Sequence, residues 1–154
     1  DFLLPDRILD TTGRSLQVGL TLDLNASEPK GLHVGSLLSV PELVRTPQQR
    51  RELASHYGAL AADLESFSVA EVCRHYQVPM WVVKIITDGV DDHLPPEVAY
   101  LMKPRKWTEK LGAVAGAIWN RPGSVKDLWQ LNELSLRASD RLAVFLLSMI
   151  PSLP

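Results

Sequence analysis

The sequence has one cysteine, no excess of positive charge and no long apolar run, and each absence excludes a class of protein. A single cysteine among 154 residues, Cys73, rules out an internal disulfide framework and a cysteine-rich zinc site. Sixteen Lys and Arg stand against 18 Asp and Glu, so nucleic acid is not indicated as a partner. Because no apolar run is long enough to span a bilayer and no signal peptide is apparent, we expect a cytoplasmic protein that does not associate with membranes.

The length fits a single domain, residues 1–154. Its central stretch, residues 58–92, is predicted to form a strand–helix–strand unit. Residues 58–63 and 80–86 are apolar runs that predict strands, the second covered on both faces, and residues 65–75 have helical apolar spacing between them. A strand, a crossover helix and a strand predict two parallel strands, whose carboxyl ends would share one sheet edge. The carboxylates expected at that edge are Asp63, Glu65, Asp88, Asp91 and Asp92.

The flanking segments complete a predicted α/β fold of three layers, α/β/α, with a mixed twisted sheet in residues 1–95 and helices in residues 96–154. Residues 2–9 are interrupted by Pro5 and predict a short or edge strand. A turn at residues 10–13 and strands at 16–24 and 31–40 follow. Thr46 is a good N-cap and Pro47 suits the first position of a helix through His56. Further helices are predicted at residues 96–102, 107–119 and 124–149, the last with the apolar stripe Leu128, Leu131, Leu134, Ala138, Leu142, Phe145 and Met149.

Two motifs in the central stretch resemble those of the nucleoside phosphorylase and nucleosidase superfamily, which includes purine nucleoside phosphorylases and methylthioadenosine/S-adenosylhomocysteine nucleosidases. Residues 62–66 (ADLES) resemble the family's D-M-E-S/A segment, and residues 83–89 (VKIITDG) resemble its V-R-x-I-S-D segment. The similarity covers residues 1 to about 92 in family order. It implies a phosphorylase-like fold from which the N-terminal strands are missing, and the chain does not begin with methionine.

The resemblance implies cleavage of the N-glycosidic bond of a nucleoside, with a purine as the expected base. Glu65 would accept hydrogen bonds from the ribose 2′ and 3′ hydroxyls, because an ionised carboxylate is a pure acceptor. Asp88 would be the catalytic acid that protonates the leaving base. Leu64, Val40 and Lys84 would complete the substrate site, with phosphate as a possible co-substrate, no other cofactor and no metal. A homo-oligomer is also expected from the family.

Departures from the family pattern leave a second interpretation open. Ser39 stands where nucleosidases often carry a base-stacking Phe, Leu37 replaces a polar residue, and the family's N-terminal half, which binds phosphate or activates water, has no counterpart. The chain could therefore be a truncated or degenerate member that binds a nucleoside or a partner subunit without catalysis.

A third interpretation is an unrelated doubly wound domain with incidental carboxylates. Without the resemblance, Glu65 would be a first-turn helix residue stabilised by the helix dipole, and Asp88 part of an Asp-Gly turn. Cys73 and Trp81 are expected in the core, and His33, His56, His75 and His93 are assigned no role.

Overall fold

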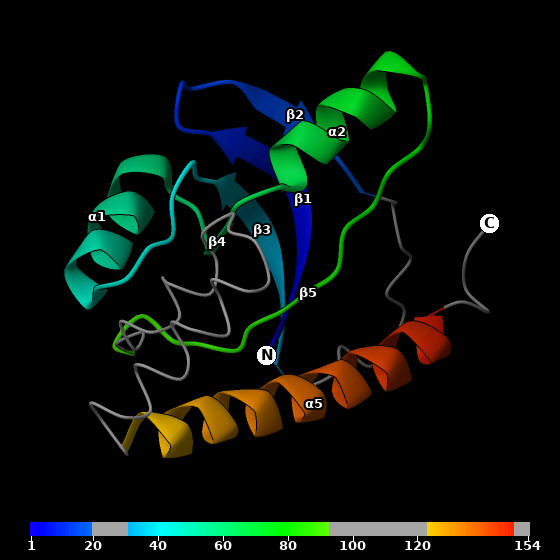
Figure 1. The fold of residues 1–154 in the computed structure, drawn as a ribbon. Helices are drawn as coiled ribbons and strands as arrows, with labels where there is room; N and C mark the ends of the chain where they lie inside the picture. The colour runs from blue at the N-terminus through cyan, green and yellow to red at the C-terminus, as the bar shows by residue number, and fades with distance from the viewer. Residues whose placement is uncertain (20–30, 93–122, 150–154) are drawn as a thin grey trace, which may run out of the picture. The chain divides into compact units, whose positions relative to one another are not determined.

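The computed structural model describes residues 1–19, 31–92 and 123–149 (Figure 1). The chain forms two compact units, one of Asp1–Asp92 with Met149–Pro154 and one of His93–Ser148. All the described strands and the helices α1 and α2 belong to the first unit. The second unit contains helix α5 (Gly123–Met149) except for its last residue. The single-domain organisation stays a prediction.

The described strands form one mixed sheet, as predicted. Its strands are β1 (Phe2–Asp10), β2 (Ser15–Gln17), β3 (Leu32–Ser39), β4 (Ala61–Asp63) and β5 (Lys84–Ile85). The order is β2-β1-β3-β4, with β5 also paired to β1. The pairs β1–β3 and β3–β4 are parallel, whereas β2 and β5 run antiparallel to β1. The parallel pair joined by a helix is therefore β3–α1–β4, one element earlier in the chain than predicted.

Strand β1 is central, so the prediction of an edge strand at residues 2–9 was wrong. It pairs with β3 on one side and with β2 and β5 on the other, and Leu3 and Ile8 are among the most buried residues of the described chain. Proline is rare in a central strand because it lacks the N–H that the ladder needs. Here the register with β3 shifts between Pro5 and Arg7, so an irregularity accommodates the proline.

Helices cover both faces of the sheet, which confirms three layers in the first unit. Neighbouring residues of a strand point to opposite faces, so Leu37 and Leu38 of β3 enter different cores. Leu37 packs with Leu3 and Ile8 against Phe67 and Ala70 of helix α2 (Ser66–His75). The second core contains Leu38, Val40 and Ala59, with Leu9, Val44, Leu53 and Tyr57 packed against it, the last two from helix α1 (Pro47–Tyr57).

Helix α1 begins and ends as its sequence predicts. The Thr46 side chain accepts from the backbone N–H of Gln49, the Gln49 side chain returns a contact to Thr46, and Pro47 follows in the first turn. This reciprocal capping box satisfies backbone donors that the helix itself leaves free. Gly58 ends the helix with φ 63°, a left-handed conformation in which glycine carries no steric penalty.

The segment after α2 differs most from expectation. Residues 80–86 were predicted to be a strand buried on both faces and parallel to residues 58–63, but only Lys84–Ile85 form a strand, which runs antiparallel to β1. β2 pairs with residues 7–9 of β1 and leaves Phe2 and Leu3 free on that side, where β5 pairs instead. The apolar run is half-buried, including Trp81. Three of its residues, Met80, Val82 and Ile86, pack against the core beneath α2.

Helix α5 confirms the predicted C-terminal helix, and part of its predicted stripe is shielded from solvent. Ala138 and Leu142 are half-buried and Phe145 and Met149 are buried, at helical spacing, whereas Leu136, Val144 and Leu147 are exposed. The predicted helices at 96–102 and 107–119 lie outside the described residues. Within the described ranges, the structure contains no helix of the length and apolarity needed to cross a membrane.

Candidate functional site

Three polar residues lie in register at the carboxyl ends of three parallel strands. Asp10 ends β1 and is paired with Ser39 of β3, which in turn is paired with Asp63 of β4. Ser39 and Asp10 are buried and Asp63 is half-buried. Ligands of open parallel sheets bind outside this edge. The row Asp10–Ser39–Asp63 therefore marks the edge at which the candidate site is built.

Asp63 is the centre of a hydrogen-bonded cluster. Its carboxylate accepts from the Ser39 hydroxyl at 2.7 Å and from the Ser66 hydroxyl, and lies 2.6 Å from Lys84 Nζ. It also accepts from the backbone N–H groups of Glu65 at 3.3 Å and Ser66 at 3.2 Å. Burial raises the pKa of Asp63, but the hydrogen bonds from Lys84, Ser66 and Ser39 outweigh it, so the pKa lies below its usual value. The carboxylate is therefore ionised, and both of its oxygens accept hydrogen bonds.

Ser39 has a structural partner on each side. While its hydroxyl donates to Asp63, its oxygen accepts the backbone N–H of Phe67 at 2.8 Å, in the first turn of α2. A hydroxyl in this place thus caps α2 from a neighbouring strand, because the first N–H groups of a helix have no partner within it. No local pattern in the sequence predicts this role, since the capping residue lies far from the helix along the chain. Leu37, the other departure from the family pattern, is fully buried in the core.

Glu65 lies at the N-cap position of α2 and is exposed. Its side chain makes no capping hydrogen bond, and its carboxylate contacts no partner among the described residues. Leu64 beside it is 41% exposed. A carboxylate at the N-terminus of a helix is favoured by the helix dipole. The first motif therefore presents one free acceptor and one apolar side chain to solvent at the carboxyl end of β4.

Asp88 follows β5 and is bound by helix α1. Its carboxylate lies 2.5 Å from Arg50 Nη2 and accepts from the Thr87 hydroxyl at 3.1 Å. Arg50 also donates to the backbone oxygen of Gly89, and its side chain is only 13% exposed. Sequence reasoning missed Arg50, because nothing in the local pattern distinguishes it from the other charged residues of α1.

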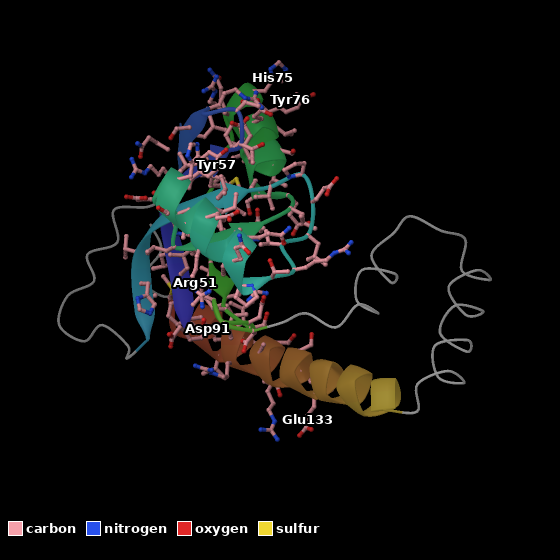
Figure 2. The ribbon with its side chains drawn as sticks, turned by 90° about the vertical axis from the view of Figure 1, so that its left-hand side faces the viewer. Arg51, Tyr57, His75, Tyr76, Asp91 and Glu133 are labelled. Carbon is pink, nitrogen blue, oxygen red and sulfur yellow. The ribbon has the colours of Figure 1, made fainter. Side chains whose placement is uncertain are left out.

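The turn after β5 is held to α1 by a second, exposed ion pair. Arg51 contacts Asp91, and Figure 2 shows the two side chains together. Within the turn, the backbone N–H of Gly89 donates to Asp92 at 2.6 Å. Asp91 and Asp92 therefore stabilise the turn itself. Among the described residues, no three His, Cys, Asp or Glu side chains are grouped so that they could hold a metal ion.

The two predicted carboxylate sets do not follow parallel strands. β4 runs parallel to β3, but β5 runs antiparallel to β1, so the argument that placed Asp88, Asp91 and Asp92 at the edge of Asp63 and Glu65 was wrong. The contact that joins the two motifs is the ion pair between Lys84 and Asp63.

Asp10 organises the other end of the row. It accepts from Thr12 and from the backbone and side chain of Arg14, the latter at 2.6 Å. Burial raises the pKa of Asp10, but these hydrogen bonds outweigh it and lower the pKa from 3.8 to about 2. Arg14 also lies 2.5 Å from Glu71 and its guanidinium stands 4.7 Å from the centre of the Phe67 ring, so it links the β1–β2 turn to α2.

A groove of about 1030 Å³ opens beside the row, on the α1 side of the sheet. It is lined by Thr11 after β1, by Val40 and the loop that follows β3, and by residues of α1. Val40 is buried, and its backbone N–H donates to the Asp63 oxygen at 2.7 Å. The apolar part of the lining comes from Val40, Leu43, Val44 and Leu53. The groove thus begins next to β4, two residues from Glu65.

Acid should weaken the fold through Asp10 and Asp63. Both pKa values are lowered in the folded protein, so the unfolded chain binds more protons in acid. The stabilisation from Asp10 is present above its unfolded pKa of 3.8 and is lost as the pH falls toward about 2, and the stabilisation from Asp63 is lost as the pH falls below the usual pKa of an aspartate. We expect the urea midpoint to fall over this range, and to fall less in Asp10→Asn. A midpoint with the same pH dependence in the variant would contradict the assignment.

The chain is similar to one protein family and to several solved structures. The family model of the Phosphorylase superfamily matches residues 16–118. No curated protein matches the chain. Among solved structures, a 5′-methylthioadenosine/S-adenosylhomocysteine nucleosidase and a futalosine hydrolase, both from Helicobacter pylori, are each 20% identical. Each match covers 59% of this chain and 48% of the other, with a TM-score of 0.49, so the chain spans about half the length of these structures. The family model covers more than half of the chain, which therefore belongs to the Phosphorylase superfamily.

Proposed function

We propose that the chain binds a nucleoside, with Glu65 accepting hydrogen bonds from the ribose hydroxyls, and takes part in cleavage of the N-glycosidic bond. The observation that carries the proposal is the carboxylate of Glu65, which is exposed at the carboxyl end of β4 and unpartnered among the described residues. An ionised carboxylate accepts two donors and so suits a cis-diol. The exposed Leu64 would meet the sugar, and family membership supports this class of substrate.

The base would bind in the groove that begins at Val40. Its apolar lining is suited to the faces of a purine, and its volume of about 1030 Å³ lies at the upper end of ordinary ligand sites. Asp88 would supply the proton to the departing base. The two Helicobacter pylori proteins are by name a nucleosidase and a hydrolase, so water is one candidate nucleophile and phosphate the other.

A second candidate is a protein that binds a nucleoside without cleaving it. The observation that favours it is the ion pair between Asp88 and Arg50. The Asp88 carboxylate is thus engaged by a guanidinium of α1, whereas a general acid must reach the leaving base. In this case Glu65 still binds the ribose, and Asp88 only stabilises the turn after β5.

Release of free base distinguishes the two candidates. The purified chain is incubated with methylthioadenosine, adenosine or inosine, with and without phosphate, and calorimetry measures binding of the same nucleosides. Release that needs phosphate indicates a phosphorylase, and release without phosphate a nucleosidase. Binding without release supports the second candidate.

Glu65→Gln tests the site itself. Removing the charge should weaken nucleoside binding by about 10- to 100-fold, the usual loss for a hydrogen bond to a charged group. Glu133→Gln on α5, which removes the charge of a half-buried glutamate away from the site, is the control and should bind as the wild type does. Unchanged affinity in Glu65→Gln would remove Glu65 from the site.

A further inference from the structure

The ammonium of Lys84 does not face open solvent. Its side chain is 27% exposed, and Nζ lies 2.6 Å from Asp63 Oδ2. The two residues come from different motifs, since Lys84 is in β5 and Asp63 ends β4. We propose that Lys84 is a positioning residue: through Asp63, it fixes the turn from which Glu65 is presented to a nucleoside.

Asp63 controls the start of α2. Its Oδ1 accepts the backbone N–H groups of Glu65 and Ser66, while Oδ2 takes the Ser66 hydroxyl and the Lys84 ammonium. Both oxygens are occupied, so the carboxylate has one orientation. Because each N–H is directed at that carboxylate, the backbone of the turn is fixed as well.

This arrangement explains why Glu65 is free. A residue at the N-cap position ordinarily uses its own side chain to accept from the first helical N–H groups. In α2 that task belongs to Asp63 and Ser39, which accept from Ser66 and Phe67, and Glu65 makes no capping hydrogen bond. The Glu65 carboxylate is consequently available to a ligand.

Lys84 is the donor on which this arrangement depends. Among the hydrogen bonds that lower the pKa of Asp63, that of Lys84 contributes most. Without the ammonium, a half-buried carboxylate would keep only neutral donors, and a buried charge that loses its partner is costly. We therefore expect the turn to loosen when the charge at position 84 is removed and to be retained when an arginine replaces the lysine.

Amide hydrogen exchange tests the turn without any ligand. In Lys84→Met, the Glu65 and Ser66 amides should exchange at least about tenfold faster relative to those of β3, which report the rest of the sheet. Lys84→Arg should restore the wild-type rates. Arg137→Met, which removes the cation of an exposed ion pair on α5, should leave them unchanged. Unchanged exchange in Lys84→Met would overturn the proposal.

Binding of adenosine and 2′,3′-dideoxyadenosine tests the consequence for Glu65. The inference rests on the proposed nucleoside site, in which only the first ligand offers hydroxyls to the carboxylate. Lys84→Met should lower the preference for adenosine about tenfold or more, as Glu65→Gln does, since small misplacements of a positioned group are costly. If Lys84 had a purely structural role, Lys84→Met would weaken the binding of both ligands equally. That result would overturn the proposal.

The two tests separate this inference from the proposed function. If wild-type protein binds neither ligand, the proposed function fails, and hydrogen exchange still decides whether Lys84 orders the turn. If Lys84→Met does not fold, Asp63→Asn is used instead, because it removes the charge on the other side of the contact and keeps an acceptor oxygen. Hydrogen exchange and the preference for adenosine are then measured on Asp63→Asn.

Discussion

Replacing Ile8 by alanine should cost about 2 to 5 kcal/mol of unfolding free energy, the usual range for a buried isoleucine. Ile8 is fully buried near the carboxyl end of the central strand, and it packs with Leu3 and Leu37 of the sheet and with Phe67 of α2. A truncated side chain would leave a cavity that the flanking strands β2 and β3 cannot fill without breaking their pairing. Urea unfolding of wild type and variant, followed by circular dichroism, measures the difference.

Val34→Ala is the matched control. Val34 is in β3 and is paired with β1, but it is 57% exposed. Its truncation should therefore change stability by less than about 0.5 kcal/mol, as for most surface substitutions. Equal losses in the two variants would mean that β1 does not occupy the centre of the sheet in solution.

Asp88→Asn should lower the rate of base release by about 10²- to 10⁴-fold, the range that one positioned proton donor contributes. Cleavage of the glycosidic bond sends electrons into the base, so a proton delivered to the base lowers the barrier. Asparagine keeps the shape of the side chain and an oxygen that Arg50 can bind, but it cannot donate a carboxyl proton. Single-turnover release of base, measured with protein in saturating excess over nucleoside, isolates this step.

The neighbouring Asp91 provides the control for this experiment. Asp91→Asn changes the same turn and weakens the exposed ion pair with Arg51, and we expect near-normal release. Urea unfolding of both variants checks that the fold is unchanged. Wild-type release in Asp88→Asn would remove Asp88 from the mechanism and leave it as the partner of Arg50.

Elements with local signals were predictable from the sequence. The Thr46 cap, Pro47 and Gly58 delimit α1 within a few residues of chain, and the helical spacing of residues 65–75 predicted α2. The place of a strand in the sheet is not a local property. Pro5 suggested an edge, yet the irregularity beside it lets β1 lie at the centre. The apolar run at residues 80–86 predicted burial on both faces, whereas its residues are half-buried in the structure.

In the candidate site, too, local motifs were predictable from the sequence and contacts between distant residues were not. The resemblance pointed to Glu65 and Asp88 from short motifs, and their roles stay predictions. The partners of these residues come from elsewhere in the chain. Arg50 reaches Asp88 from α1, and Ser39 and Lys84 reach Asp63 from two other strands. No periodicity or spacing in one sequence reveals such contacts, because they depend on which strands become neighbours.

The central position of β1 has a consequence for folding during synthesis. β1 precedes its partners along the chain: only the hairpin with β2 can form early, whereas Leu4 must wait for Val34 and Phe2 for Ile85. Until then the strand lacks these later partners, and such long-range pairing is slow and prone to aggregation. We expect the yield of folded protein to depend on chaperones that bind nascent chains, and to rise when translation of residues 11–85 is fast.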